Sequence, residues 1–134
     1  MLASPQGGAG GIGSASAELW LREGGCAVVA DVNDADGNAF AARHPGRVVF
    51  VHCDTRRRGD LETAIAAATS LGAFTAMFCN AGVASALDNL DDALENWESL
   101  LRVVDINVNA CALGTFLALK AGSLVFVSLL QIAK

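Results

Sequence analysis

The sequence predicts an α/β protein whose parallel sheet is covered by helices on both faces, a doubly wound arrangement. Apolar, β-branched segments alternate along the chain with segments of helical periodicity, and such an alternation forms parallel strands joined by right-handed crossovers. A glycine-rich loop at residues 7–13 then opens the first helix. The length of 134 residues allows one domain, 1–134.

The first expected helix spans residues 14–23, directly after the glycine loop. Its apolar spacing comes from Ile12, Ala15 and Leu19, and a glycine pair starting at Gly24 ends it. This helix therefore follows the loop without a linker.

Four apolar segments are expected to form strands. Their ranges are 26–32, 47–54, 73–79 and 123–130. Of these segments, 26–32 is an apolar, β-branched run that indicates a strand buried on both faces.

Three further helices are expected between these strands. One covers 34–43, one begins at Asp60 as its cap and runs to Leu71, and the last covers 91–120. The last helix carries an apolar stripe with steps of four and three residues. Its members are Leu90, Leu94, Trp97, Leu101, Val104 and Val108. This stripe could cover the sheet or pair with a second copy of the chain.

The strand that should precede the glycine loop is the weakest element of the pattern. Only MLASPQ stands before the loop. Pro5 cannot donate a ladder hydrogen bond, so we expect this first strand to be eroded and a full central strand to be implausible.

Composition and charge exclude several classes. Hydrophobic residues make up 53% of the chain and charged residues 17%, which excludes intrinsic disorder. A net charge of −5 argues against nucleic-acid partners. The basic run Arg56–Arg58 is expected to be a solvated loop, with a phosphate contact as the alternative.

The four cysteines indicate a reducing, cytoplasmic location rather than a disulfide framework. They are Cys26, Cys53, Cys79 and Cys111. None forms a C-x-x-C pair and no histidine stands at ligand spacing, so we expect no metal site.

Residues 110–133 are the strongest membrane candidate by composition. Lys120 lies near their middle, and Gly114 and Gly122 interrupt the apolar pattern. A central lysine costs about 2.5–3.5 kcal/mol in a membrane helix. We therefore expect a buried helix followed by a buried strand, and no membrane.

The glycine loop matches G-x-G-x-x-G at Gly8, Gly10 and Gly13. Because the loop opens a helix, the first backbone amides of that helix can hold a pyrophosphate. Ser14 follows where a Walker loop requires lysine, so a P-loop is excluded.

Asp31 ends the next strand, where dinucleotide-binding folds place the acid that binds the ribose hydroxyls. A carboxylate there repels a 2′-phosphate, and Val32 and Asn33 offer no compensating cation. The residues therefore favour NAD over NADP. The alternative is a solvated acid at the end of a strand.

At this point the pattern resembles the classical short-chain dehydrogenases/reductases, over nearly the whole chain but only about half of a typical member. The family loop T-G-x-x-x-G-x-G aligns with residues 6–13, with Gln6 in place of threonine. The resemblance implies an incomplete Rossmann-like domain without its C-terminal strands and helices. The cofactor-binding residues it implies are Gly7, Gly8, Gly11, Ile12, Gly13, Asp31, Val32, Asp54, Thr55, Asn80, Ala81 and Gly82.

The family's catalytic pattern is only partly present. The resemblance implies a catalytic role for Asn107, which aligns with an asparagine that holds a water in the proton relay, and for Ser128 at the end of the fifth strand. Asn107 also fits a satisfied polar core residue. The family's Tyr-x-x-x-Lys pair has no counterpart, because the chain contains no tyrosine.

These observations predict an NAD-preferring oxidoreductase acting on an alcohol/carbonyl pair, with this chain itself lacking turnover. A non-catalytic nucleotide- or partner-binding fragment is the first alternative, and an adenosine-cofactor methyltransferase the second. Bare apolar faces also predict homo-oligomerisation or aggregation.

Overall fold

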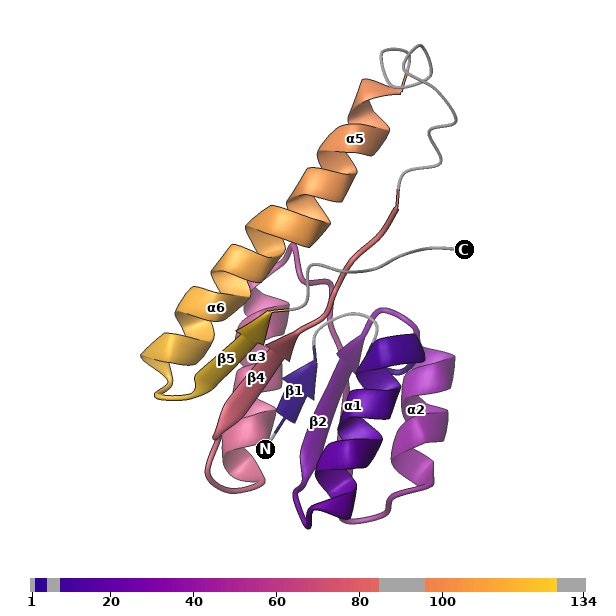
Figure 1. Ribbon diagram of the computed structural model, residues 1–134, viewed down its shortest axis with the longest axis vertical. Helices are drawn as coiled ribbons and strands as arrows, with labels where there is room; N and C mark the ends of the chain where they lie inside the picture. The colour runs from indigo at the N-terminus through magenta and orange to yellow at the C-terminus, as the bar shows by residue number, and fades with distance from the viewer. Residues whose placement is uncertain (1, 5–7, 85–95, 128–134) are drawn as a thin grey trace.

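The computed structural model describes residues 2–4, 8–84 and 96–127. Five parallel strands form one sheet in the order β3-β2-β1-β4-β5 (Figure 1). The strands are β1 Leu2–Ser4, β2 Ala27–Asp31, β3 Val48–His52, β4 Ala76–Cys79 and β5 Leu124–Val127. The order reverses beside β1, which is where doubly wound sheets place their ligands.

Helices cover both faces of this sheet, as the sequence predicts. One face carries α1 (Gly11–Arg22) and α2 (Asp34–Ala42), and the opposite face carries α3 (Arg58–Ser70) and α6 (Ala110–Lys120) (Figure 1). A further helix, α5 (Trp97–Val104), joins α6 through the π-helical turn η1 (Asp105–Asn109). The partial, Rossmann-like α/β fold is therefore confirmed.

The position of β2 between two layers of helices explains why its sequence is apolar throughout. Val28 and Ala30 belong to the core beneath α3 and α6, whereas Ala27 and Val29 belong to the core beneath α1 and α2. All five residues of β2 are buried. A strand covered on both faces needs apolar residues at every position rather than at alternate ones.

The N-terminal segment Leu2–Ser4 forms a short strand. Strand β1 lies in the middle of the sheet and pairs with both β2 and β4. Three described residues form it, Leu2–Ser4, and residues 5–7, which follow, lie outside the described residues. The described first strand is therefore short, as the expectation of an eroded strand requires, and it is not a full central strand, although it occupies the centre of the sheet.

Several element boundaries differ from the predicted ones. Helix α1 begins at Gly11 rather than residue 14, because the end of the glycine loop is already helical. Helix α3 begins at Arg58, two residues before the predicted cap Asp60. Strand β4 begins only at Ala76. The predicted helix residues 91–95 and strand residues 128–130 lie outside the described residues.

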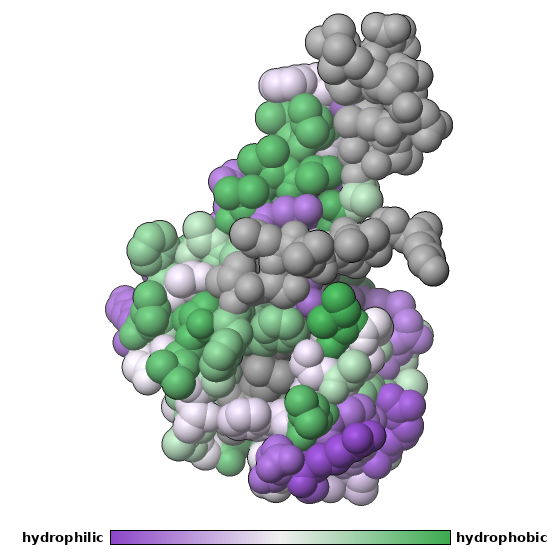
Figure 2. Space-filling view, viewed as in Figure 1, coloured by the Kyte–Doolittle hydropathy of each residue, from purple (hydrophilic) through white to green (hydrophobic). Residues whose placement is uncertain are grey.

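The long helix turns its apolar stripe away from the sheet. A row of small residues and one isoleucine packs inward, namely Ile106, Ala110, Gly114 and Ala118. The described members of the predicted stripe are between 41% and 55% exposed, and they are Trp97, Leu101, Val104 and Val108. Figure 2 shows apolar side chains gathered along α5, the part of the helix that projects from the body. Of the two roles left open by the sequence, covering the sheet is excluded for this stripe.

Within the described part of the chain, one helix is long and apolar enough to cross a membrane by length and composition, namely Trp97–Lys120. Its most apolar window has a mean hydropathy of 1.4, and 17% of that window is buried. An amphipathic helix that packs one face on a sheet and exposes an apolar stripe meets the same criterion. Composition alone is therefore weak evidence for a membrane span.

Candidate nucleotide-binding site

The predicted site residues meet at the carboxyl edge of the sheet. Asp31 ends β2, Asp54 and Thr55 follow β3, and Asn80 follows β4. The described part of the glycine loop lies between β1 and α1 at the same edge. Parallel strands bring these segments together because all of their carboxyl ends point the same way.

The glycine loop has the backbone geometry that a phosphate cradle needs. Gly11 has φ +52, a conformation that side chains disfavour, and it is the first residue of α1. Gly8 and Gly13 are buried, whereas Ile12 is 51% exposed. The first amides of a helix have no intrahelical acceptor, so this end of α1 favours an anion. Gly7 lies outside the described residues.

Asp31 links the glycine loop to the end of β2. Its Oδ2 accepts a hydrogen bond from the backbone N–H of Ala9 at 3.3 Å, and its Oδ1 accepts one from Asn33 at 2.9 Å. The side chain is buried, with 5% exposure. The alternative of a solvated acid at the strand end is therefore wrong. The Ala9 contact joins residues 22 apart and has no local sequence signal.

Beside this carboxylate, Val32 and Asn33 play different parts. Val32 is 41% exposed, which leaves its side chain at the surface of the site. The Asn33 side chain instead caps α2 by accepting from the N–H of Asp36 at 3.2 Å. Neither residue brings a positive charge near Asp31.

Asp54 is held by a bidentate ion pair. Arg56 donates through Nε to Asp54 Oδ1 at 2.9 Å and through Nη2 to Oδ2 at 2.6 Å. This hydrogen-bonded pair holds the pKa of the Asp54 carboxyl below its usual value. Asp60, predicted to be a helix cap, instead accepts from the backbone N–H of Asp54 at 3.0 Å. The two acids together shape the loop after β3.

The basic run is largely committed to local ion pairs. Arg56 pairs with Asp54, and Arg58 pairs with Glu62 one turn along α3 at 2.7 Å. All three arginines are exposed. These contacts fit the predicted solvated loop between a strand and a helix.

Replacing Asp54 by asparagine is expected to lower the melting temperature near neutral pH and to have less effect in acid. A carboxyl whose pKa is lower in the folded chain stabilises the fold above its unfolded pKa of about 3.9. That stabilisation is lost as the pH falls through the folded-state pKa. Melting curves of the original chain and of Asp54→Asn, at neutral pH and below about pH 4, measure the difference between their melting temperatures.

Glu62→Gln is the matched control for this measurement, because it removes an exposed partner of Arg58 in a pair one helical turn apart. Such pairs contribute about 0.3–0.5 kcal/mol. A gap between Asp54→Asn and the original chain that stays constant across the pH range would contradict the role given to the Asp54 charge.

The Thr55 side chain lies in the interior, whereas a side chain that contacts a ligand needs to be accessible. It is 1% exposed and lines two small cavities against α6, of about 220 and 10 Å³. Its side chain therefore packs between the loop and the helix rather than facing solvent. The predicted cofactor role of Thr55 remains a prediction.

Asn107 joins the long helix to the segment after β4. Its Oδ1 accepts from the backbone N–H of Val83 at 2.9 Å, and its Nδ2 donates to the carbonyl of Val83 at 3.0 Å. Val83 directly follows Asn80, Ala81 and Gly82, which are predicted to bind the cofactor and are called the cofactor strip below. These two hydrogen bonds therefore hold the backbone at the end of the cofactor strip.

The local helix geometry accounts for the placement of Asn107. It lies inside η1, a π-helical turn of the kind that often marks functional sites. The two hydrogen bonds to Val83 fit the alternative of a satisfied polar residue, while the catalytic role of Asn107 remains a prediction. Ser128, the other predicted catalytic residue, lies outside the described residues.

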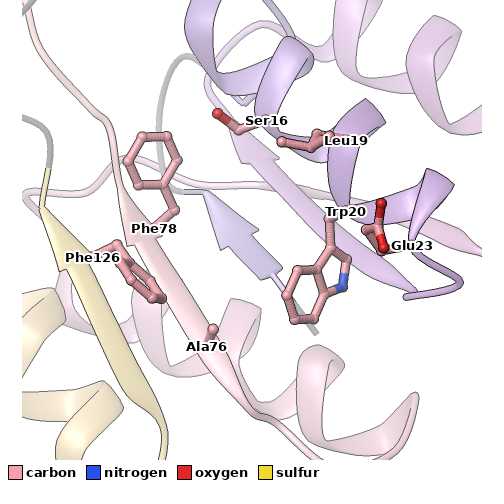
Figure 3. Close-up of a pocket in the computed structure, with 7 residues that line it drawn as sticks. All are labelled: Ser16, Leu19, Trp20, Glu23, Ala76, Phe78 and Phe126. Atoms are coloured by element: carbon pink, nitrogen blue, oxygen red, sulfur yellow. The ribbon is translucent and has the colours of Figure 1, made fainter.

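A separate apolar groove of about 390 Å³ lies between α1 and a face of β4 and β5 that no described helix covers (Figure 3). Figure 3 shows Leu19 and Trp20 on one side of it, with Phe78 and Phe126 on the other. The groove reaches Glu23 at the end of α1 and Ala76 at the start of β4, away from the carboxyl edge. It is therefore distinct from the nucleotide site.

Among the described residues, no group of three or more His, Cys, Asp or Glu side chains could hold a metal ion. The four cysteines are free thiols.

The strand order, the glycine loop at a helix N-terminus and the carboxylate bonded to that loop define an α/β domain of the dinucleotide-binding class. The family model described as short chain dehydrogenase matches residues 5–130. The chain therefore belongs to the short-chain dehydrogenase/reductase family, and the methyltransferase alternative is not supported.

Characterised relatives and solved structures agree with this assignment. The chain is 35% identical over 124 residues to short chain aldehyde dehydrogenase 1 of Euphorbia lathyris, covering 90% of this chain and 41% of that protein. It is 33% identical over 113 residues to tropinone reductase-like 1 of Erythroxylum coca, covering 81% of this chain and 40% of that protein. The chain thus spans about 40% of the length of these relatives.

Two solved structures from Brucella melitensis share the fold. One is a 3-ketoacyl-(acyl-carrier-protein) reductase complexed with NADH, with a TM-score of 0.80 and 24% identity over 90% of this chain and 49% of that chain. The other is a short-chain dehydrogenase/reductase described as glucose/ribitol dehydrogenase, with a TM-score of 0.79 and 28% identity over 90% and 51%. The fold therefore matches about half of each structure.

Proposed function

We propose that this chain forms the NAD-binding part of an oxidoreductase that acts on an alcohol/carbonyl pair. The observation that carries the proposal is the contact between Asp31 and the backbone of Ala9 in the glycine loop. It brings the acid expected at the ribose next to the helix N-terminus expected at the pyrophosphate. Family membership supports the class of reaction.

Different residues would hold the pyrophosphate and the adenosine ribose of the cofactor. The amides at the start of α1 would face the pyrophosphate, and Asp31 would face the adenosine ribose. A carboxylate has about four lone-pair sites, so its two backbone bonds are compatible with further acceptance. The segment Asn80–Gly82, held by Asn107, would border the nicotinamide half. The nicotinamide itself supplies the hydride acceptor or donor.

The proposal includes a preference for NAD over NADP. A 2′-phosphate near Asp31 would place like charges together, and like charges at short range repel by amounts that burial increases. Among the described residues beside Asp31, neither Val32 nor Asn33 can neutralise that phosphate.

We further propose that the chain as given binds the cofactor without turnover. Proton exchange with an alcohol needs a general acid or base close to the substrate. The tyrosine that the family uses for this step has no counterpart in a sequence without tyrosine. The free thiols support a reducing, cytoplasmic location.

Thermal melting and absorbance assays together test this proposal. Millimolar NAD is expected to raise the melting temperature, with less protection by NADP, because a ligand that binds only the folded state stabilises it. No NADH absorbance should develop with a panel of primary and secondary alcohols. No protection by NAD would reject the nucleotide-binding role, and turnover with any of the alcohols would reject the inactive-chain role.

The exposed stripe on the long helix supports a homo-oligomer, which we propose as a second property. The four side chains Trp97, Leu101, Val104 and Val108 present one continuous apolar face. The double change Leu101→Glu with Val108→Glu should leave the monomer folded and reduce self-association at least about tenfold, because each buried aliphatic side chain contributes about 1.5–3 kcal/mol.

Sedimentation velocity over a range of concentrations measures this effect. Glu98→Gln with Arg102→Gln, polar changes on the same helix, serves as the control. Unchanged self-association in the glutamate variant, or a monomeric parent chain, would contradict the oligomer.

A further inference from the structure

Two cysteines from different elements meet directly behind the predicted cofactor strip. Cys79 is the last residue of β4 and immediately precedes Asn80, and Cys111 lies in the first turn of α6. Both line the cavity of about 10 Å³ that also contacts Ala81. Cys79 is 4% exposed, whereas Cys111 is partly exposed.

Close packing of α6 on β4 produces this meeting. Gly114 lies one turn after Cys111, and a Cβ atom at that position would lie 3.5 Å from the Cys79 sulfur and 3.2 Å from the Met77 methyl. Because glycine has no side chain, the helix approaches the strand closely here, and both cysteines border the same small cavity.

We propose that Cys79 and Cys111 form a thiol pair that a low-molecular-weight disulfide converts reversibly into an intramolecular disulfide. This modification would fasten α6 to the end of β4 beside Asn80–Gly82. It goes beyond the proposed cofactor binding and does not depend on it.

The order of the two chemical steps follows from exposure and acidity. Burial raises the pKa of the Cys79 thiol to about 12, so this thiol is protonated at neutral pH. The more exposed Cys111 thiolate therefore attacks glutathione disulfide, forming a mixed disulfide and releasing one glutathione thiolate. Cys79 then loses its proton and attacks the Cys111 sulfur, which releases the second glutathione. Two protein thiols are oxidised and one glutathione disulfide is reduced to two glutathiones.

Oxidation should also change the local structure. A disulfide holds its two Cβ atoms about 3.5–4.5 Å apart. Forming it therefore links the first turn of α6 covalently to the end of β4. The oxidised protein is expected to melt at a higher temperature than the reduced protein, and dithiothreitol should reverse the shift.

The test uses the full chain with Cys26→Ser, which removes the partly exposed cysteine at the opposite end of the sheet. After incubation with glutathione disulfide, peptide mass spectrometry should find Cys79 joined to Cys111 and Cys53 still a free thiol. Adding Cys79→Ser should leave glutathione trapped on Cys111. Adding Cys111→Ser should prevent both products.

Three results would overturn the proposal. They are a stable glutathione adduct on Cys111 while Cys79 is intact, the absence of any reaction at Cys111, and pairing of either residue with Cys53. Melting curves and circular dichroism of the reduced variants establish that each serine protein is folded. Because serine is close in size to cysteine, both variants should keep the parent secondary structure.

Discussion

Replacing Asp31 by asparagine is expected to weaken NAD binding and to reduce the preference for NAD over NADP by about 10–100-fold. The change removes the negative charge while keeping a side chain of the same shape. A hydrogen bond to a charged group contributes about 1.5–3 kcal/mol, which corresponds to this range of affinity. Isothermal titration calorimetry with both nucleotides gives the two dissociation constants and their ratio.

Asp36→Asn is the matched control for this change. Asp36 lies in the first turn of α2 and bonds to Asn33 rather than to the glycine loop. Its loss removes an equal charge from an exposed position, where solvent screens it. An unchanged nucleotide ratio in Asp31→Asn, or an equal change in Asp36→Asn, would contradict the role assigned to Asp31.

Replacing Asn107 by alanine is expected to lower the free energy of unfolding by about 2 kcal/mol or more. The side chain satisfies both the N–H and the carbonyl of Val83. Leaving a buried backbone group without a partner costs about 1–3 kcal/mol, and Val83 is partly buried. Urea denaturation followed by circular dichroism measures the change, provided the slope stays constant.

Asn109→Ala tests whether the effect belongs to the Val83 contact. Asn109 lies in the same π-helical turn but is exposed, and its amide bonds to Asp105 on the helix surface. Its replacement should cost about 0.5 kcal/mol or less. Equal losses in the two variants would show that the helical turn, rather than the link to Val83, is responsible.

A catalytic role for Asn107 would require evidence that stability cannot supply. Asn107→Asp retains an acceptor for the Val83 N–H but loses the donor to its carbonyl, and it adds a charge. We expect it to be destabilised about as much as Asn107→Ala. The two substitutions therefore test whether Asn107 positions the segment around Val83 through its two hydrogen bonds.

Much of the fold follows from local sequence signals. The uniformly apolar run of β2 predicts burial on both faces, and its alternate residues indeed enter two separate cores. The glycine loop is predicted to open the first helix, and Gly11 of that loop is the first residue of α1. These features are predictable because they depend on the residue itself or on its immediate neighbours.

Boundaries and pairings were less predictable, since they depend on distant parts of the chain. Pro5 predicts an eroded first strand, but only the pairing with β2 and β4 shows that Leu2–Ser4 occupies the centre of the sheet. Aspartate is a common helix-capping residue, yet the Asp60 carboxylate accepts a hydrogen bond from the backbone N–H of Asp54 instead. A residue's preference for capping helices does not reveal that a backbone N–H in the β3–α3 loop will bind the same carboxylate.

The sequence by itself determined the alternating α/β order, the glycine loop, the acid at the end of β2 and the absence of a tyrosine. Only the tertiary structure decided that Asp31 holds the loop through Ala9, that Asn107 holds Val83, and that Cys79 meets Cys111. It also decided that the stripe from Trp97 to Val108 faces outward, because the small residues Ala110, Gly114 and Ala118 let the opposite face of the helix approach the sheet. Periodicity identifies an apolar face, but packing against a neighbour decides which face is buried.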